Sequence, residues 1–103
     1  MSLDFETLTE LRDEMLALIE KTTDINEKKE LRDQLKKLRK LINKNILENL
    51  DQATVEYQNA TVALDNANQA IKEAQQDIAK VAETITLIAK GIDLAVEAAG
   101  TVT

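Results

Sequence analysis

A seven-residue repeat of apolar side chains runs through the second half of the chain, from Leu50 to Ala99. A larger residue recurs at every seventh position, and a smaller residue, most often alanine, follows it three positions later. This is the spacing of helices that lie against other helices. The repeat therefore predicts one long helix over residues 50–99, which would be about 75 Å long at 1.5 Å per residue.

We call the apolar stripe of this predicted helix the seam. The seam residues expected to carry association are Leu50, Tyr57, Leu64, Ala67, Ile71, Ala74, Ile78, Val81, Ile85, Ile88, Ile92 and Ala95. Alanine lets two helix backbones approach closely, with bulky residues packing beside the small ones. An antiparallel partner can place isoleucine or leucine layers against alanine layers, whereas a parallel one would face alanine with alanine. The seam therefore favours antiparallel packing, as a coiled coil or helical bundle.

Two shorter helices are predicted before this repeat, over residues 4–22 and 24–44. Asp4 can cap the first, and Asp24 followed by Glu27 has the spacing of a capping box at the start of the second. Each segment carries an apolar stripe at helical spacing. The rest of the first is mostly acidic and the rest of the second mostly basic, so we expect an antiparallel hairpin with complementary flanks.

The segment Asn43–Asn49 has two interpretations. The apolar stripe passes through it in consecutive steps of four residues, which inside a continuous helix is a stutter. In that case residues 24–99 form one helix. Alternatively, the three asparagines in this segment mark a turn, because asparagine tolerates the left-handed backbone found where helices end. The sequence leaves both interpretations open.

The composition fits a single all-helical domain over residues 1–103. The chain has no proline and two glycines, so the usual residues of tight turns between strands are scarce. Apolar residues make up 44% of the chain, enough to bury a core, but aromatic residues contribute only 2%. Leucine, isoleucine and alanine must therefore supply the packing.

A length argument then predicts association. If the chain turns near Asn45, the second helix covers only about 30 Å of the long third helix. The uncovered part, Ile71–Ala99, is the most apolar stretch of the sequence. Exposed apolar patches of that extent mark interaction surfaces. We expect a homo-oligomer, either a dimer or a tetramer, or a complex with another helical protein.

Catalytic, cofactor and metal sites are not expected. The chain has neither cysteine nor histidine, so the best transition-metal ligands and the most common nucleophile–base pairs are missing. Glu73 and Asp77 are four residues apart, but no Glu-x-x-His motif accompanies them. Tyr57 falls on the seam, which predicts core packing for its ring.

One basic cluster is a candidate for contact with anions. Its members are Lys36, Lys37, Arg39, Lys40 and Lys44. The acidic first helix would offset much of this charge, no aromatic side chains interleave for base stacking, and the chain carries a net charge of −6. These features argue against nucleic acid as a partner.

The sequence therefore predicts a non-catalytic, self-associating helical module that acts as a scaffold, adaptor or structural subunit through the 71–99 surface. The alternative is a membrane-active protein, pore-forming or bound at the lipid interface, that exposes residues 81–99 on lipid. The four charged residues in that segment argue against a simple spanning helix. The N-terminus lacks the pattern of a cleavable signal, so the cytoplasm is the default location, with secretion without a signal left open.

Overall fold

The computed structural model describes residues 5–44 and 54–100, and within these ranges every regular element is a helix. The elements are α1 (Phe5–Lys21), α2 (Ile25–Lys44), α3 (Val55–Gln76) and α4 (Val81–Gly100), with a one-turn 3₁₀ helix, η2 (Ile78–Lys80), between the last two. The predicted all-helical class is confirmed.

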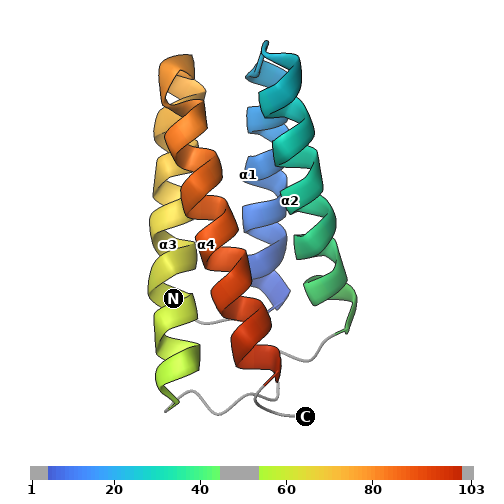
Figure 1. The fold of residues 1–103 in the computed structure, drawn as a ribbon, viewed down its shortest axis with the longest axis vertical. Helices are drawn as coiled ribbons and strands as arrows, with labels where there is room; N and C mark the ends of the chain where they lie inside the picture. Colours follow the sequence, from blue (N-terminus) through green and yellow to red (C-terminus); the bar gives the residue numbers. More distant parts are fainter. Residues whose placement is uncertain (1–4, 45–53, 101–103) are drawn as a thin grey trace.

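The four helices form two hairpins packed side by side (Figure 1). Helix α1 pairs with α2, and α3 pairs with α4, each as an antiparallel hairpin. Between the hairpins, α1 packs on α3 and α2 packs on α4, with each of these two pairs running in the same direction. The bundle measures 39 × 21 × 19 Å.

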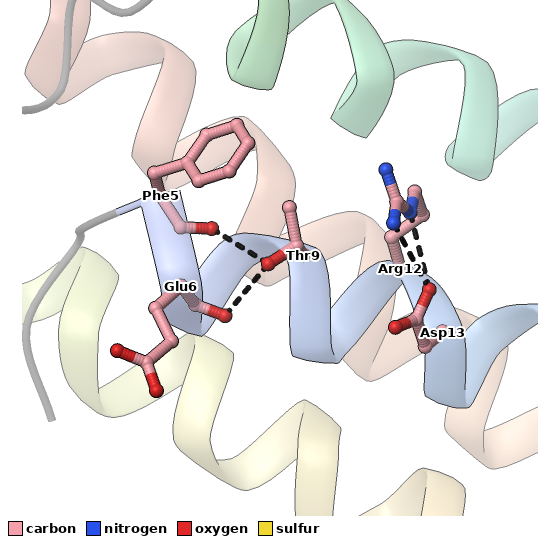
Figure 2. A network of polar contacts seen from close by, with 5 residues as sticks. All are labelled: Phe5, Glu6, Thr9, Arg12 and Asp13. Carbon is pink, nitrogen blue, oxygen red and sulfur yellow. Dashed lines mark hydrogen bonds and ion pairs between the residues drawn. The ribbon is translucent and has the colours of Figure 1, made fainter.

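Helix α1 shows how the N-terminal hairpin is attached. Near its start its polar contacts are local: the Thr9 hydroxyl lies 2.9 Å from the carbonyl oxygens of both Phe5 and Glu6, and Arg12 pairs with Asp13 at 3.2 Å (Figure 2). Its apolar stripe is buried, as the pattern predicted, at Leu8, Leu11, Met15, Leu18 and Ile19. Burial of this stripe attaches α1 to the bundle, since exposed ion pairs contribute little.

The predicted turn between the first two helices is confirmed. The Asp24 carboxylate accepts a hydrogen bond from the Glu27 backbone N–H at 2.9 Å, which is the capping contact that the sequence indicated. The buried Thr22 hydroxyl donates to the Leu18 carbonyl at 2.7 Å and so satisfies one of the last carbonyls of α1. Asp4, the predicted cap of α1, lies outside the described residues.

The complementary charges of α1 and α2 do not form ion pairs between these helices within residues 5–44. The contact between them relies on apolar side chains; on α2 these are Leu31, Leu35, Leu38, Leu41 and Ile42, all buried. The opposite net charges of the two helices therefore act only as a diffuse attraction.

The prediction of one helix over residues 50–99 is wrong, and so is the continuous helix over 24–99. Helix α3 ends at Gln76, and the chain reverses through Asp77 and η2 into α4. The apolar repeat did not reveal this break, because it stays in phase: Val81 follows Ala74 by seven residues whether or not the chain turns between them. Helix α2 extends to Lys44, and the remainder of Asn43–Asn49, where a turn or a stutter was predicted, lies outside the described residues.

The reversal also overturns the length argument. Helix α4 folds back along α3, so a single chain buries most of its own seam. The antiparallel partner that the alanine positions favoured is supplied by the second half of the same repeat.

Candidate functional site

The predicted association seam is the interior of the α3–α4 hairpin. Ten of its twelve residues are buried there: Tyr57, Leu64, Ala67, Ile71, Ala74, Val81, Ile85, Ile88, Ile92 and Ala95. Ile78 is the exception, with 46% of its surface exposed, and Leu50 lies outside the described residues. These side chains are therefore available to a second chain only if the hairpin opens.

Two contacts define the register of the hairpin. The Thr84 hydroxyl lies 2.9 Å from the Lys80 carbonyl oxygen and 3.3 Å from the Ala70 carbonyl oxygen, so it connects α4 to the backbone of α3. Seven residues further along α4, Gly91 lies against Ala63, which is seven residues back along α3. The antiparallel register of α3 and α4 is therefore the same at both contacts. Asp77 lies seven residues before Thr84 on one side and seven residues after Ala70 on the other, so the same spacing leads from both helices to Asp77.

The turn that closes the hairpin is short. Asp77 adopts an extended backbone (φ −141°, ψ 97°), and its carboxylate accepts a hydrogen bond from the Ala79 backbone N–H at 3.2 Å. The N–H of Asp77 donates to the Glu73 carbonyl and so ends α3. Lys80 lies 3.8 Å from the Glu73 carboxylate in an exposed ion pair that spans the turn. No glycine or proline is present in this segment.

The basic cluster of α2 lies beside an open groove between α2 and α4, of about 730 Å³. Lys36, Lys37 and Lys40 line this groove, and Arg39 is exposed on the same helix. The side chain of Lys44 lies outside the described part of the chain. Glu30 and Asp33 line the groove as well, so its charge is mixed. The structure thus brings three of the five predicted anion-contact residues together, but beside two carboxylates that weaken their attraction for an anion.

A second groove, of about 410 Å³, runs along the outer face of the α3–α4 hairpin. Its lining is Asn59, Val62, Ala63, Asn66, Leu87, Lys90 and Leu94. Lys90 is the one charged residue in that set, and Val62 has 61% of its surface exposed. This groove was not predicted from the sequence, because residues 50–99 were expected to form one straight helix.

The carboxylates and helices of the described residues bear on metal binding and membrane insertion. Among them no group of three or more carboxylates lies close enough to hold a metal ion. Glu73 and Asp77, the carboxylate pair of the sequence, serve instead the ion pair with Lys80 and the cap at Ala79. Within the same residues, no helix has the length and hydropathy needed to cross a bilayer.

Comparisons with known proteins give no match: no family model, no curated protein sequence and no solved structure resembles the chain at a significant level. The most distinctive feature of the chain is the seam, which is continuous in sequence and folded in two in space.

Proposed function

We propose that this chain is a non-catalytic helical module that associates with further copies of itself and acts as a scaffold, adaptor or structural subunit. The seam is the surface through which it associates, and residues 71–99 supply most of that surface. A dimer is the simplest assembly, because one two-fold axis gives both copies the same contacts.

The continuity of the seam through the α3–α4 turn is the observation that carries this proposal. The buried layers on α3 and α4 belong to one repeat, whose phase does not change at Asp77–Lys80. The same layers fit equally well between an α3 and an α4 that come from different copies. A hairpin that served only to close on itself would not need a repeat that continues in phase across its turn.

The chemical repertoire of the chain supports the non-catalytic part of the proposal. The sequence has no cysteine and no histidine, so acid–base and nucleophilic chemistry would depend on carboxylates, lysines and a single tyrosine. That tyrosine, Tyr57, is buried in the hairpin. The buried polar side chains among the described residues are Thr22, Asn68 and Thr84, none of which is a titratable group.

The membrane-active alternative has less support. Exposing residues 81–99 on lipid would require opening the bundle, because Val81, Ile88 and Ile92 are buried in it. The same opening would bring these residues to a second copy of the chain, where matching alanine layers already exist. Association is therefore the simpler use of the same surface.

Solution mass, measured by light scattering over a wide concentration series, tests the proposal. We expect a dimer or tetramer whose share rises with concentration. Ile78→Asp introduces a charge at the seam position that the closed hairpin leaves 46% exposed, and Val62→Asp introduces the same charge on the outer face of the same hairpin. The seam variant should weaken the assembly and the outer-face variant should not, with circular dichroism verifying that both remain helical.

Each other outcome has a distinct meaning. A monomer at every concentration would refute self-association. An assembly that only Val62→Asp disrupts would keep self-association but move the contact from the seam to the outer groove.

A further inference from the structure

The turn between α3 and α4 has few contacts that would resist straightening. The closed turn depends on the Asp77 cap at Ala79, two backbone hydrogen bonds and the exposed Lys80–Glu73 pair. An exposed ion pair of this kind contributes little. None of the four residues from Asp77 to Lys80 is a glycine or a proline, so all of them can adopt helical backbone.

Ile78 would gain from straightening. In the hairpin this large apolar side chain is 46% exposed, although it occupies a seam position of the repeat. In a continuous helix through the turn, Ile78 would lie on the same face as Ile71 and Ile85, seven residues to either side. The repeat thus specifies a buried isoleucine at a position where the closed hairpin leaves nearly half of its surface exposed.

The register of the hairpin is also that of a two-fold dimer. Thr84 faces Ala70 and Gly91 faces Ala63. In each pair the two residues are the same number of positions from Asp77, one before it and one after it. Two straightened chains crossing antiparallel at Asp77 would therefore reproduce each contact, with α4 of one copy lying on α3 of the other. A continuous helix over residues 55–100 would be about 70 Å long.

We propose that Asp77–Lys80 is a hinge at which the α3–α4 hairpin opens, so that two copies exchange α4 and form an intertwined dimer. Each half of this dimer is a four-helix bundle made of α1, α2 and α3 from one chain and α4 from the other. The exchange keeps the buried layers of the hairpin and adds the burial of Ile78 at the two-fold axis. Exchange of an identical element is a low-cost route to dimers.

This inference rests on the proposed self-association and names its geometry. Asp77 favours the closed hairpin over the exchanged dimer for two reasons. Its carboxylate caps η2 in the hairpin, and at the two-fold axis it would approach the same carboxylate of the second copy. The hinge residue is therefore also the residue that limits exchange.

Proline at position 78 separates the two forms. Ile78 is the first residue after the Asp77 cap, where proline is well tolerated, and Asp77 already has the extended backbone that a residue before proline prefers. In a continuous helix, the same proline would clash with the Ala74 carbonyl and remove a hydrogen bond. We expect Ile78→Pro to keep the hairpin and to weaken the dimer by roughly four orders of magnitude, since both copies carry the proline.

Ile25→Pro is the matched control. Ile25 is likewise the first residue after an aspartate cap, and it is 83% exposed at the start of α2, in a separate turn at the same end of the bundle as the hinge (Figure 1). This variant should dimerise like the wild type. Asp77→Ala has the opposite effect to Ile78→Pro: it removes the cap and the repulsion at the axis, and should tighten the dimer about 100-fold. Each protein is equilibrated at high concentration under mild denaturant, diluted, and measured by light scattering and circular dichroism.

A cysteine pair reports the exchange directly, because the chain has no cysteine of its own. Ala70→Cys with Thr84→Cys places the two thiols where the hairpin brings these residues together. Oxidation of an exchanged dimer joins two chains, giving a covalent dimer in denaturing electrophoresis. Oxidation of the closed hairpin gives a bond within one chain.

The outcomes separate the inference from the proposed function. Covalent dimers, together with loss of the dimer in Ile78→Pro but not in Ile25→Pro, support the hinge. A dimer that tolerates Ile78→Pro and closes its cysteine bonds within each chain overturns the exchange and leaves self-association intact. A monomeric wild type with an exchanged Asp77→Ala dimer overturns the proposed function while supporting the hinge. Monomers throughout overturn both.

Discussion

Gly91 of α4 lies directly against Leu64 of α3: a Cβ atom added to Gly91 would lie 2.9 Å from the Leu64 Cδ2 atom and 3.3 Å from the Ala63 carbonyl oxygen. The hairpin therefore depends on the missing side chain for its close approach. Alanine is the better helix former by about 1 kcal/mol. Because Leu64 is fully buried and cannot move freely, we expect overpacking to outweigh this gain.

Gly91→Ala should accordingly lower the free energy of unfolding by about 1 kcal/mol, measured by urea denaturation. The double variant with Leu64→Val is the control, since valine withdraws the atom that clashes. In the Leu64→Val background, Gly91→Ala should be neutral or stabilising. If Gly91→Ala costs the same in both backgrounds, contact with Leu64 is not the reason for the glycine.

The same pair of helices shows what the sequence could and could not predict. The apolar stripes predicted the helical class and the bounds of α1 within one residue, and the Asp24–Glu27 spacing predicted the cap of α2. They missed the reversal at Asp77, because a four-residue turn fits into a seven-residue repeat without a change of phase. A local signal was present: Asp77-Ile78 repeats the Asp24-Ile25 dipeptide that starts α2. The periodicity indicates which residues are buried, but it does not indicate whether the covering helix comes from another chain or from the second half of the same repeat.

Asn68 in α3 is 9% exposed, and its side-chain oxygen Oδ1 has no hydrogen-bond partner. A buried acceptor without a donor costs about 1–3 kcal/mol. Asn68→Ala removes that acceptor and improves helix propensity, so we expect it to raise the free energy of unfolding by about 1 kcal/mol despite the small cavity.

Asn66→Ala is the matched control, because Asn66 is an exposed asparagine in the same helix. Asn66→Ala raises the helix propensity by the same amount, but it removes no buried acceptor that lacks a hydrogen bond. The difference between the two variants in thermal denaturation isolates the effect of burial. An equal gain in both would mean that the Asn68 oxygen finds a partner in solution, such as a water molecule.

The Asp24 cap supports the start of α2. Its carboxylate accepts the Glu27 N–H at 2.9 Å, and replacing such a cap by alanine typically costs about 1 kcal/mol. Asp24→Ala should lower the melting temperature for this reason. Asp33→Ala, at an exposed position in the middle of the same helix, should leave it unchanged or raise it, because alanine is the better helix former there. Similar losses in both variants would indicate an effect of charge and not of capping.

The candidate surfaces were predicted less well than the helices. The basic cluster and the seam were identified by residue type, but their surroundings depend on which helices become neighbours. Lys36, Lys37 and Lys40 face a groove that also contains Glu30 and Asp33, which a list of basic residues cannot show. The outer groove at Val62 and Leu87 exists only because α4 folds back on α3.

The two hairpins are joined by a polar contact between α1 and α3. The Gln75 side-chain amide donates to the Glu14 carboxylate at 2.7 Å, at a half-buried position. Gln75→Ala should cost about 1 kcal/mol in urea denaturation, whereas Gln69→Ala, exposed on the same helix, should cost nothing measurable. Gln75→Glu places two like charges at hydrogen-bond distance and should cost more than Gln75→Ala. Because the site is partly exposed, this additional cost should shrink as salt is added. An additional cost that does not change with salt would mean that steric fit, and not charge, selects glutamine at this position.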